Sequence, residues 1–257
     1  MDTQRMPGSW LAHCKERAKK ESFGAFGAKD GARCPVLFEW ILTDIQAPDC
    51  VAVKKQVANL GCQSVVPVEL AFLKARPDGV LSDGFLRACV PFFLKGLAEV
   101  DWSAVKNKID EVLRQIYTVD IAQFGPEVVQ KLAQDLLLFI TVKDIQTDDL
   151  IGFISCGITP ASAFGDIKII TCAVSPEQVH RNVEKMLFAA IFKVIPDVQR
   201  LFMGTRPTNS RAIELYQSFG FTKDEAPAQD VNHQINLKNW VVLEYKADQS
   251  SELQKIF

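Results

Sequence analysis

The residues whose types and spacing could do chemistry gather in the segment Thr205–Phe221, a pattern typical of a strand end followed by a capped amphipathic helix. Thr208 or Asn209 can cap that helix, because a side-chain oxygen at this position accepts a hydrogen bond from a free backbone N–H group. Spacing alone predicts that Tyr216 is a core aromatic residue with its hydroxyl group at the rim. It shares one helical face with three other residues: Ala212, Leu215 and Phe219.

The complete motif supports a functional interpretation of the same residues. The pattern Asn209-x-x-Ala212-x-x-x-Tyr216-x-x-x-Gly220-Phe221 resembles the C-terminal signature of the GNAT superfamily of acyl-CoA-dependent N-acetyltransferases. The resemblance covers residues 136–246. It implies an N-acyltransferase that moves an acetyl group from acetyl-CoA to an amine-bearing acceptor, a small molecule or a peptide, by direct attack. The alternative is a non-catalytic binding or scaffold module of the same shape, because fold alone does not determine activity.

The resemblance also implies where acetyl-CoA would bind. In this family the fourth and fifth strands, which correspond here to Asp166–Val174 and Val198–Thr205, splay apart, and the pantetheine pairs with the exposed backbone of the fourth strand. A backbone N–H group there would stabilise the oxyanion that forms during attack. The strand residues assigned to the cofactor in this way are Thr171, Cys172, Ala173 and Val174. Cys172 itself is interpreted as a packing residue, because no neighbour in the sequence lowers the pKa of its thiol.

The resemblance gives roles to the helix residues as well. Tyr216 matches the family's helix tyrosine, which is placed to protonate the leaving thiolate of CoA. Asn209 matches the family's asparagine, which contacts the cofactor or fixes the loop, and Ala212 is assigned to the cofactor-binding set. Direct attack needs no covalent acyl-enzyme, so the lack of an evident Cys–His pair fits this mechanism.

The pyrophosphate loop departs from the family pattern. The family places Arg or Gln, then a Gly, then a Gly or Ala after the fourth strand, and here these places hold Val179, Asn182 and Glu184. Asn182 tolerates the left-handed backbone conformation that a glycine would adopt. The Glu184 carboxylate is unfavourable near a pyrophosphate, whereas His180 and Arg181 can donate hydrogen bonds to phosphate.

A second interpretation of the same loop requires no ligand. Ser175-Pro176-Glu177-Gln178 is a capping box, with Pro at the first helical position. A helix that begins at Pro176 would then use the whole loop, and an apolar stripe supports it: Val179, Val183, Met186, Leu187, Ala190 and Val194. Both interpretations stay open at this point.

The acceptor side has no assigned general base. Family members often use a Glu on the fourth strand, but the inner part of Asp166–Val174 has no carboxylate, and Asp166 lies too near its start. His180 or a chain of waters could substitute. The loop that holds Asp224, Glu225, Asp230 and His233 either lines the acceptor mouth, where it would attract a cationic amine, or is a solvated acidic loop.

Composition excludes several other classes of protein. The chain has 257 residues, of which 48% are hydrophobic and 23% charged, so it is not a mostly disordered chain. Lys and Arg number 29 against 31 Asp and Glu, a net charge of −2 that disfavours nucleic-acid binding. Seven Cys without a CxxC pair and three His predict no metal site and a reducing, cytoplasmic location. No apolar run approaches the roughly 20 residues of a membrane span, and no signal sequence is evident.

Hydrophobic periodicity predicts an α/β fold with a mixed, mostly antiparallel sheet flanked by helices and GNAT-like in order. We expect a basic, glycine-containing tail over 1–34, a strand and helix portion of the same domain over 35–135, and the GNAT-like core over 136–248. Expected strands are Val36–Ile45, Val65–Lys74, Leu136–Val142, Leu150–Ile158, Asp166–Val174, Val198–Thr205, Phe221–Lys223 and Leu237–Lys246. Expected helices are a short one around Trp10–Lys20, Val51–Leu60, Phe85–Leu97, Ser103–Tyr117, Glu127–Gln134, one within Pro176–Ile195, and Ser210–Phe219, with Ser22–Gly31 as a loop.

Overall fold

The fold is that of a computed structural model, and it is described for residues 9–29, 35–79, 86–118, 135–159, 162–224, 239–247 and 252–257. These residues form one sheet whose strand order is β1-β2-β3-β4-β5-β6-β8-β7. Every neighbouring pair is antiparallel except β5 and β6, which are parallel. The strands are Phe23–Lys29 (β1), Pro35–Asp44 (β2), Leu136–Asp144 (β3), Leu150–Ile158 (β4), Asp166–Val174 (β5), Arg200–Thr205 (β6), Thr222–Lys223 (β7) and Val241–Lys246 (β8).

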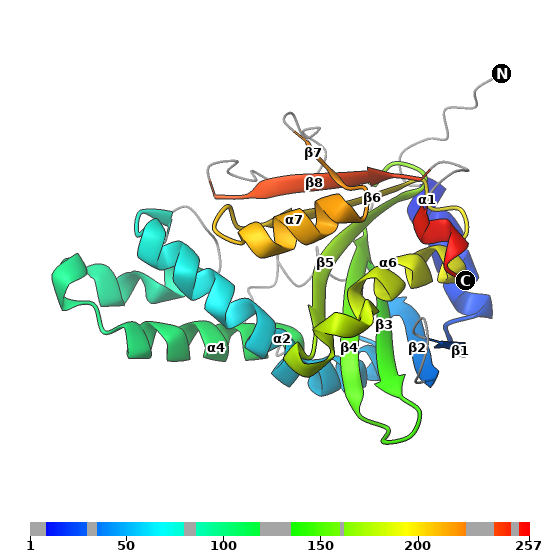
Figure 1. Ribbon diagram of the computed structural model, residues 1–257, viewed down its shortest axis with the longest axis horizontal. Coiled ribbons are helices and arrows are strands. Elements are labelled where there is room, and N and C mark those ends of the chain that lie inside the picture. Colours follow the sequence, from blue (N-terminus) through cyan, green and yellow to red (C-terminus); the bar gives the residue numbers. More distant parts are fainter. Residues whose placement is uncertain are drawn as a thin grey trace.

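Helices cover both faces of this sheet and make two separate cores (Figure 1). One core packs α1, α6 and α7 against the sheet, and the other packs α2, η1 and α4. The α-helices are Ser9–Lys20 (α1), Pro48–Ala75 (α2), Trp102–Thr118 (α4), Val183–Val194 (α6) and Ser210–Ser218 (α7). The 3-10 helices are Leu86–Phe93 (η1), Leu97–Glu99 (η2), Pro176–Arg181 (η4) and Glu252–Lys255 (η5).

The predicted fold class is confirmed, and most of the predicted strands and helices after residue 135 are present within one or two residues of their expected ends. The mostly antiparallel mixed sheet with its single parallel pair is the architecture that the GNAT resemblance implied. The predicted helix Glu127–Gln134 lies outside the described residues, as does the start of the last predicted strand. Among the described residues, no helix is both long and apolar enough to cross a membrane.

The predicted strand Val65–Lys74 is wrong, because these residues are the second half of α2. The β-branched residues near Pro67 favoured a strand locally, but burial recurs at helical spacing from Cys50 to Leu73. Tertiary packing overrides local propensity here. The helix predicted over Val51–Leu60 continues through Gly61 to Ala75, and a glycine fits at position 61 because a Cβ atom there would come within 2.7 Å of the Tyr117 ring.

Two further local predictions need correction. Phe85–Leu97, predicted as one α-helix, contains the 3-10 helix η1 and the start of η2, since Pro91 and Gly96 interrupt regular α-helix formation. The predicted loop Ser22–Gly31 holds strand β1, which pairs along its whole length with β2. Glycine composition suggested a loop, but Gly24 lies under the Trp40 ring, where no side chain fits.

The N-terminal helix α1 is attached to the sheet by one tryptophan. The Trp10 side chain is 0% exposed, and its indole Nε1 donates a 2.8 Å hydrogen bond to the backbone oxygen of Asp166 at the start of β5. Its ring also packs edge-on against Phe164, with 4.8 Å between ring centroids. Part of the region expected to be a tail therefore packs onto the strand that carries the candidate site.

We expect Trp10→Ala to lower the free energy of unfolding by about 3–5 kcal/mol, the usual cost of truncating a buried tryptophan. Chemical denaturation would measure this change. The matched control is Phe23→Ala, whose parent side chain is 75% exposed and whose loss should change stability by less than about 0.5 kcal/mol. Similar effects of the two substitutions would contradict a docked α1.

Candidate functional site

The parallel strands β5 and β6 diverge in the middle of the sheet. Their pairing runs from Asp166 opposite Arg200 to Ile169 opposite Met203 and stops there, although β5 continues to Val174. In Figure 1, β8 runs across the view whereas β3 and β4 run down it, so the sheet opens between these groups of strands. Among the described strands, residues 171–174 pair only with β4. Backbone groups on their other side can therefore accept an extended ligand as a partner.

A β-bulge lies at the start of this divergence. Thr171 faces Ser155 across the β4–β5 ladder, and Ile169 faces the next residue, Cys156, so Ile170 is the extra residue. The Ile170 side chain is 54% exposed, although it belongs to a central strand. A bulge bends its strand and redirects side chains, which is why bulges often occur beside functional sites.

The bulge determines which face each predicted cofactor residue uses. Ile167, Ile169 and Val174 all belong to the core under α6 and α7, and Cys172 packs against the same core. Ala173 lies in the core under α2 and α4. Thr171 is directed to that second face as well, since its Oγ1 lies 3.2 Å from the Tyr117 hydroxyl of α4.

Burial keeps the thiol and phenol groups beside the divergence protonated. It raises the pKa of Cys172 well above its usual range, with a further contribution from the Glu184 charge, which opposes Cys172 as a nucleophile. Burial also raises the pKa of Tyr117 to about 12, despite the opposing hydrogen bond from Thr171. These two groups can donate hydrogen bonds but do not supply a charge.

The segment after β5 is divided at Asn182. The 3-10 helix η4 covers Pro176–Arg181, Asn182 adopts the left-handed conformation at φ 55° and ψ 26°, and α6 begins at Val183. The alternative of one continuous capped helix from Pro176 is therefore wrong, and the Ser175 side chain makes no capping hydrogen bond. The left-handed conformation expected at Asn182 is confirmed.

This division starts a second helix, α6, at Val183, and the Glu184 charge in its first turn acts on Cys172 of β5. The first turn of α6 has backbone N–H groups without partners in the helix, and the positive end of the helix dipole favours an anion there. The backbone is thus suited to a phosphate group, although the two expected glycines are missing. The side chains of Val179, His180 and Arg181 lie outside the described part of the structure.

Glu184 occupies this first turn with its own carboxylate. The carboxylate accepts a hydrogen bond from its own backbone N–H, and the Arg211 charge acts to lower its pKa. Burial outweighs both effects and raises the pKa of Glu184 above its usual value. The Glu184 charge in turn contributes to the raised pKa values of Cys172 and Tyr216, which indicates that the three side chains lie near one another.

Tyr216 lies on α7 inside an aromatic cluster. Its ring centroid is 5.5 Å from that of Phe188 and 6.1 Å from that of Phe221. Burial, followed by the Cys172 and Glu184 charges, raises the pKa of its phenol far above the usual value. The residue is a packed core aromatic, as spacing alone predicted, and its hydroxyl stays protonated and able to donate.

Asn209 holds the turn before α7 in a way that the sequence did not predict. Its side chain does not cap the helix; instead its Nδ2 donates to Thr205 Oγ1 at 3.1 Å, and its backbone N donates to the Arg206 oxygen at 2.9 Å. This geometry fits the expectation that the asparagine fixes the loop. Ala212, one turn later, is partly buried against the core of Tyr216.

The inner part of β5 has no carboxylate that could act as a general base, but it carries a lysine, Lys168. Asp166 is paired with Arg200, so it is not a free base. Lys168 pairs with Gly157 of β4, and Thr171 pairs with Ser155, two residues away on the same strand. Residues two apart on a strand share a face, so the side chains of Lys168 and Thr171 lie on the same face of the sheet. Burial lowers the pKa of Lys168, while Asp135 opposes that shift. Of the acidic loop, Asp224 is described, and Glu225, Asp230 and His233 lie outside the described residues.

The sequence analysis missed Tyr117, Lys168 and a buried ion pair between Glu69 and Arg206. Tyr117 lies on the buried face of α4, so its spacing alone indicates only a packing role. Two features of the sequence could have suggested the other groups: the lysine inside an apolar strand and the arginine directly after one. Neither feature predicts a partner, since Glu69 is 137 residues from Arg206.

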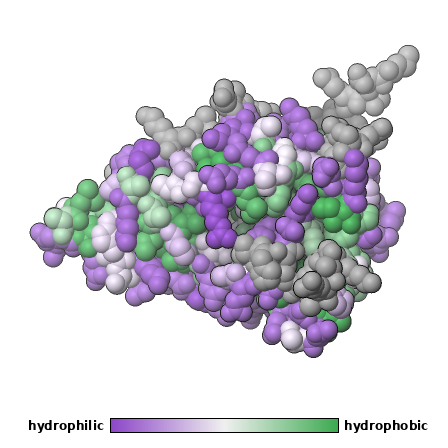
Figure 2. Space-filling view, in the orientation of Figure 1, coloured by the Kyte–Doolittle hydropathy of each residue, from purple (hydrophilic) through white to green (hydrophobic). Residues whose placement is uncertain are grey.

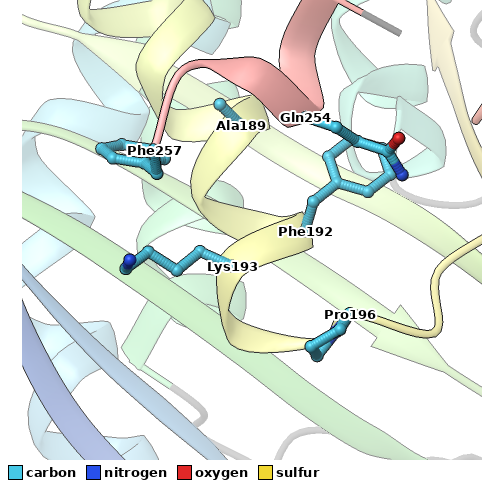
Figure 3. Close-up of a pocket in the computed structure, with 6 residues that line it drawn as sticks. All are labelled: Ala189, Phe192, Lys193, Pro196, Gln254 and Phe257. Atoms are coloured by element: carbon cyan, nitrogen blue, oxygen red, sulfur yellow. The ribbon is translucent and has the colours of Figure 1, made fainter. Parts of the chain in front are cut away.

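A cavity of about 250 Å³ lies elsewhere, between α6 and the C-terminal segment (Figure 3). Its walls are Ala189, Phe192, Lys193, Pro196, Gln254 and Phe257. It lies toward the opposite end of α6 from Asn182 and includes none of the candidate residues. In the part of the chain that the structure describes, no group of His, Cys, Asp and Glu could hold a metal ion.

Comparison with known proteins identifies a family for part of the chain. The sequence model of the Acetyltransferase (GNAT) family matches residues 107–221. Among solved structures, PaiA N-acetyltransferase from Thermoplasma acidophilum in complex with coenzyme A aligns at 13% identity and TM-score 0.43, covering 81% of this chain and 99% of that one. The comparison with curated proteins found no match.

Two other solved structures align over smaller shares of this chain. An acyl-CoA N-acyltransferase from Klebsiella pneumoniae, described as putative, aligns at 19% identity and TM-score 0.37, covering 58% of this chain and 93% of that one. Nourseothricin acetyltransferase aligns at 16% identity and TM-score 0.35, covering 44% of this chain and 66% of that one.

We expect Glu184→Gln to change how stability depends on pH. Because the folded-state pKa of Glu184 is raised, its contribution to stability is fully present below the unfolded-state pKa and is lost as pH rises through the folded-state pKa. The variant does not lose this stability, so its free energy of unfolding should increase relative to that of the parent as pH rises from 4 to 7. Urea denaturation at each pH measures this, with Glu177→Gln at an exposed position as control. A constant difference across this range would contradict a buried carboxylate.

Proposed function

We propose that this chain, whose residues 107–221 belong to the GNAT acetyltransferase family, transfers an acyl group, most simply acetyl, from acyl-CoA to an amine. The observation that carries the proposal is the divergence of β5 from β6 beyond Ile169, at a bulge. It presents a strand backbone on which the amides of pantetheine can pair as an added strand would. The acceptor is unidentified and is required only to be a primary or secondary amine.

The cofactor would extend from this strand toward α6. Backbone groups of Thr171, Cys172, Ala173 and Val174 would pair with pantetheine, and the first N–H groups of α6, which begins after the left-handed Asn182, would bind phosphate. We assign the pyrophosphate to that turn. The Glu184 carboxylate already accepts the N–H group of its own residue, so it must rotate away when a phosphate binds.

The chemistry would proceed by direct attack. The amine nitrogen attacks the thioester carbonyl carbon, and a backbone N–H of β5 donates to the oxyanion of the tetrahedral intermediate. The C–S bond then breaks, and Tyr216 donates a hydrogen bond or a proton to the CoA thiolate. Its raised pKa keeps the phenol protonated for this role. Lys168 is our candidate to accept the amine's proton, because a lowered pKa increases its neutral fraction.

A second candidate function is a non-catalytic binding or scaffold module of the same shape, with a degenerate cofactor loop. The observation that favours it is the Glu184 carboxylate in the first turn of α6, where a phosphate would meet a negative charge. The two functions share the fold and differ in turnover, so binding and catalysis have to be measured separately.

We expect CoA and acetyl-CoA to bind the full chain. A ligand that binds only the folded state stabilises it by RT ln(1 + [L]/Kd), which is about 2.7 kcal/mol at a hundredfold excess over Kd. Thermal denaturation and calorimetry with each ligand measure this effect. ATP, which carries phosphates without pantetheine, is the control ligand. No heat and no thermal shift at millimolar CoA would reject the acyltransferase and favour the scaffold module.

We expect Tyr216→Phe to lower kcat by about 10²-fold, the lower end of the range for general acid catalysis, while the KM for acetyl-CoA changes little. The ring is retained, so the aromatic cluster should stay packed. The matched control is Tyr245→Phe, another buried tyrosine, packed against Phe221 in the same core. An acceptor is found first by screening polyamines, aminoglycosides and lysine peptides. Parent-like turnover by the Tyr216 variant would show that the residue serves packing only.

A further inference from the structure

A fully buried ion pair lies at the end of β6. Arg206 follows the strand directly and is 1% exposed, and its partner Glu69 on α2 is 3% exposed. The guanidinium Nε lies 2.8 Å from Oε2 and 3.0 Å from Oε1, and Nη2 lies 2.7 Å from Oε2. Several short contacts therefore fix the guanidinium on the carboxylate, a strong and directional arrangement.

The same guanidinium contacts two further parts of the fold. It lies between two aromatic rings, with its carbon 4.3 Å from the Phe72 centroid and 3.8 Å from the Trp240 centroid. Its Nη1 donates to the Asn239 oxygen at 3.2 Å, just before β8. Arg206 thus joins α2, the end of β6 and the start of β8 at one point.

Stability alone gives no reason for this pair. Removing two charges from water costs several kcal/mol for each ion, and apolar residues of similar volume often replace a buried ion pair with no loss or with a gain of stability. An apolar replacement would fill the same space but would not fix orientation. Such a pair adds a defined orientation, because the planar guanidinium group forms good hydrogen bonds only with partners in a narrow range of positions.

Its position connects that orientation to the candidate site. The Arg206 backbone oxygen accepts the Asn209 N–H, so this residue also starts the turn that leads into α7 and Tyr216. On the other side of the wedge, the pairing of β5 with β6 ends at Ile169. The place where Arg206 is held therefore sets both the end of β6 and the start of α7.

We propose that Glu69 and Arg206 are positioning residues, which hold the end of β6 on α2 and so fix the width of the wedge between β5 and β6. This inference rests on the proposed function, because the wedge is where acyl-CoA would bind. Neither side chain touches the reacting atoms. Glu69 lies outside the residues 107–221 that match the family, so the N-terminal part of the chain contributes to the site's geometry.

The main test is the double substitution Glu69→Leu with Arg206→Met in the full chain. We expect it to keep most of the parent's resistance to urea, because the space remains filled by apolar atoms. We expect the backbone amides of residues 205–210, apart from Pro207, which has no N–H, to exchange with solvent at least about tenfold faster, since local opening no longer breaks directional contacts. Residues 200–203, paired on both sides, should keep the parent's exchange rates and serve as an internal control.

The matched control is the Glu39–Lys143 pair, a cross-strand contact of 2.9 Å between β2 and β3. Glu39→Leu with Lys143→Met should leave the exchange of residues 205–210 unchanged. If the Glu69 and Arg206 double variant also keeps parent-like exchange there, the pair only fills space and the inference is wrong.

Two further measurements separate the possible failures. Arg206→Lys keeps the charge but loses the planar guanidinium group, so this variant should fold and still show faster exchange at residues 205–210. Unchanged exchange in this variant would overturn the inference, even if the double variant does not fold. Calorimetry with CoA should show an affinity about tenfold weaker in either variant that folds. A parent that fails to bind CoA rejects the proposed function, whereas the exchange data still decide the role of the pair.

Discussion

The need of each backbone N–H and C=O group for a partner is the constraint on which the rest of this structure depends. Most of the sheet meets that need through neighbouring strands, but β5 loses β6 as a partner beyond Ile169. A gap of this kind in the centre of a sheet is costly unless water or a ligand fills it. The bulge at Ile170 and the exposed side chain of that residue mark the same place. Under the proposed function, this gap is the surface on which the amides of pantetheine would pair.

Electrostatics around the gap are unusual for a site that would bind phosphates. Burial raises the pKa of Cys172, Tyr216 and Glu184, so the interior end of the wedge favours neutral, protonated groups. That environment suits a thioester and an un-ionised amine. Because these side chains are neutral, an anion would bind to the backbone of α6, whose first N–H groups and dipole favour negative charge. The balance between this favourable end and the Glu184 carboxylate decides how tightly CoA would bind.

The sequence predicted the part of the fold where short-range patterns and packing agree. Strands β3 to β6 are short, mostly apolar runs and helix α7 has a helical apolar pattern, and both features match the observed burial. The motif from Asn209 to Phe221 lies within the residues 107–221 that match the GNAT family model. Predictions failed where contacts between residues far apart in the sequence determine the local structure. Residues 65–74 have strand-like composition but complete α2, and Trp10 is buried only because the start of β5 is there to receive it. The pair of Glu69 and Arg206 could not be predicted, because nothing local connects residues in an N-terminal helix and at the end of a late strand.

The most direct test of the central claim is amide hydrogen exchange of β5 with and without saturating acetyl-CoA. The account predicts that the amides of residues 170–174 that point away from β4 exchange more slowly when acetyl-CoA is present, together with the first amides of α6. Residues 167–169, which already pair with β6, should not change. Unchanged exchange at residues 170–174 with acetyl-CoA bound would contradict the claim that this strand's unpaired backbone is the binding surface.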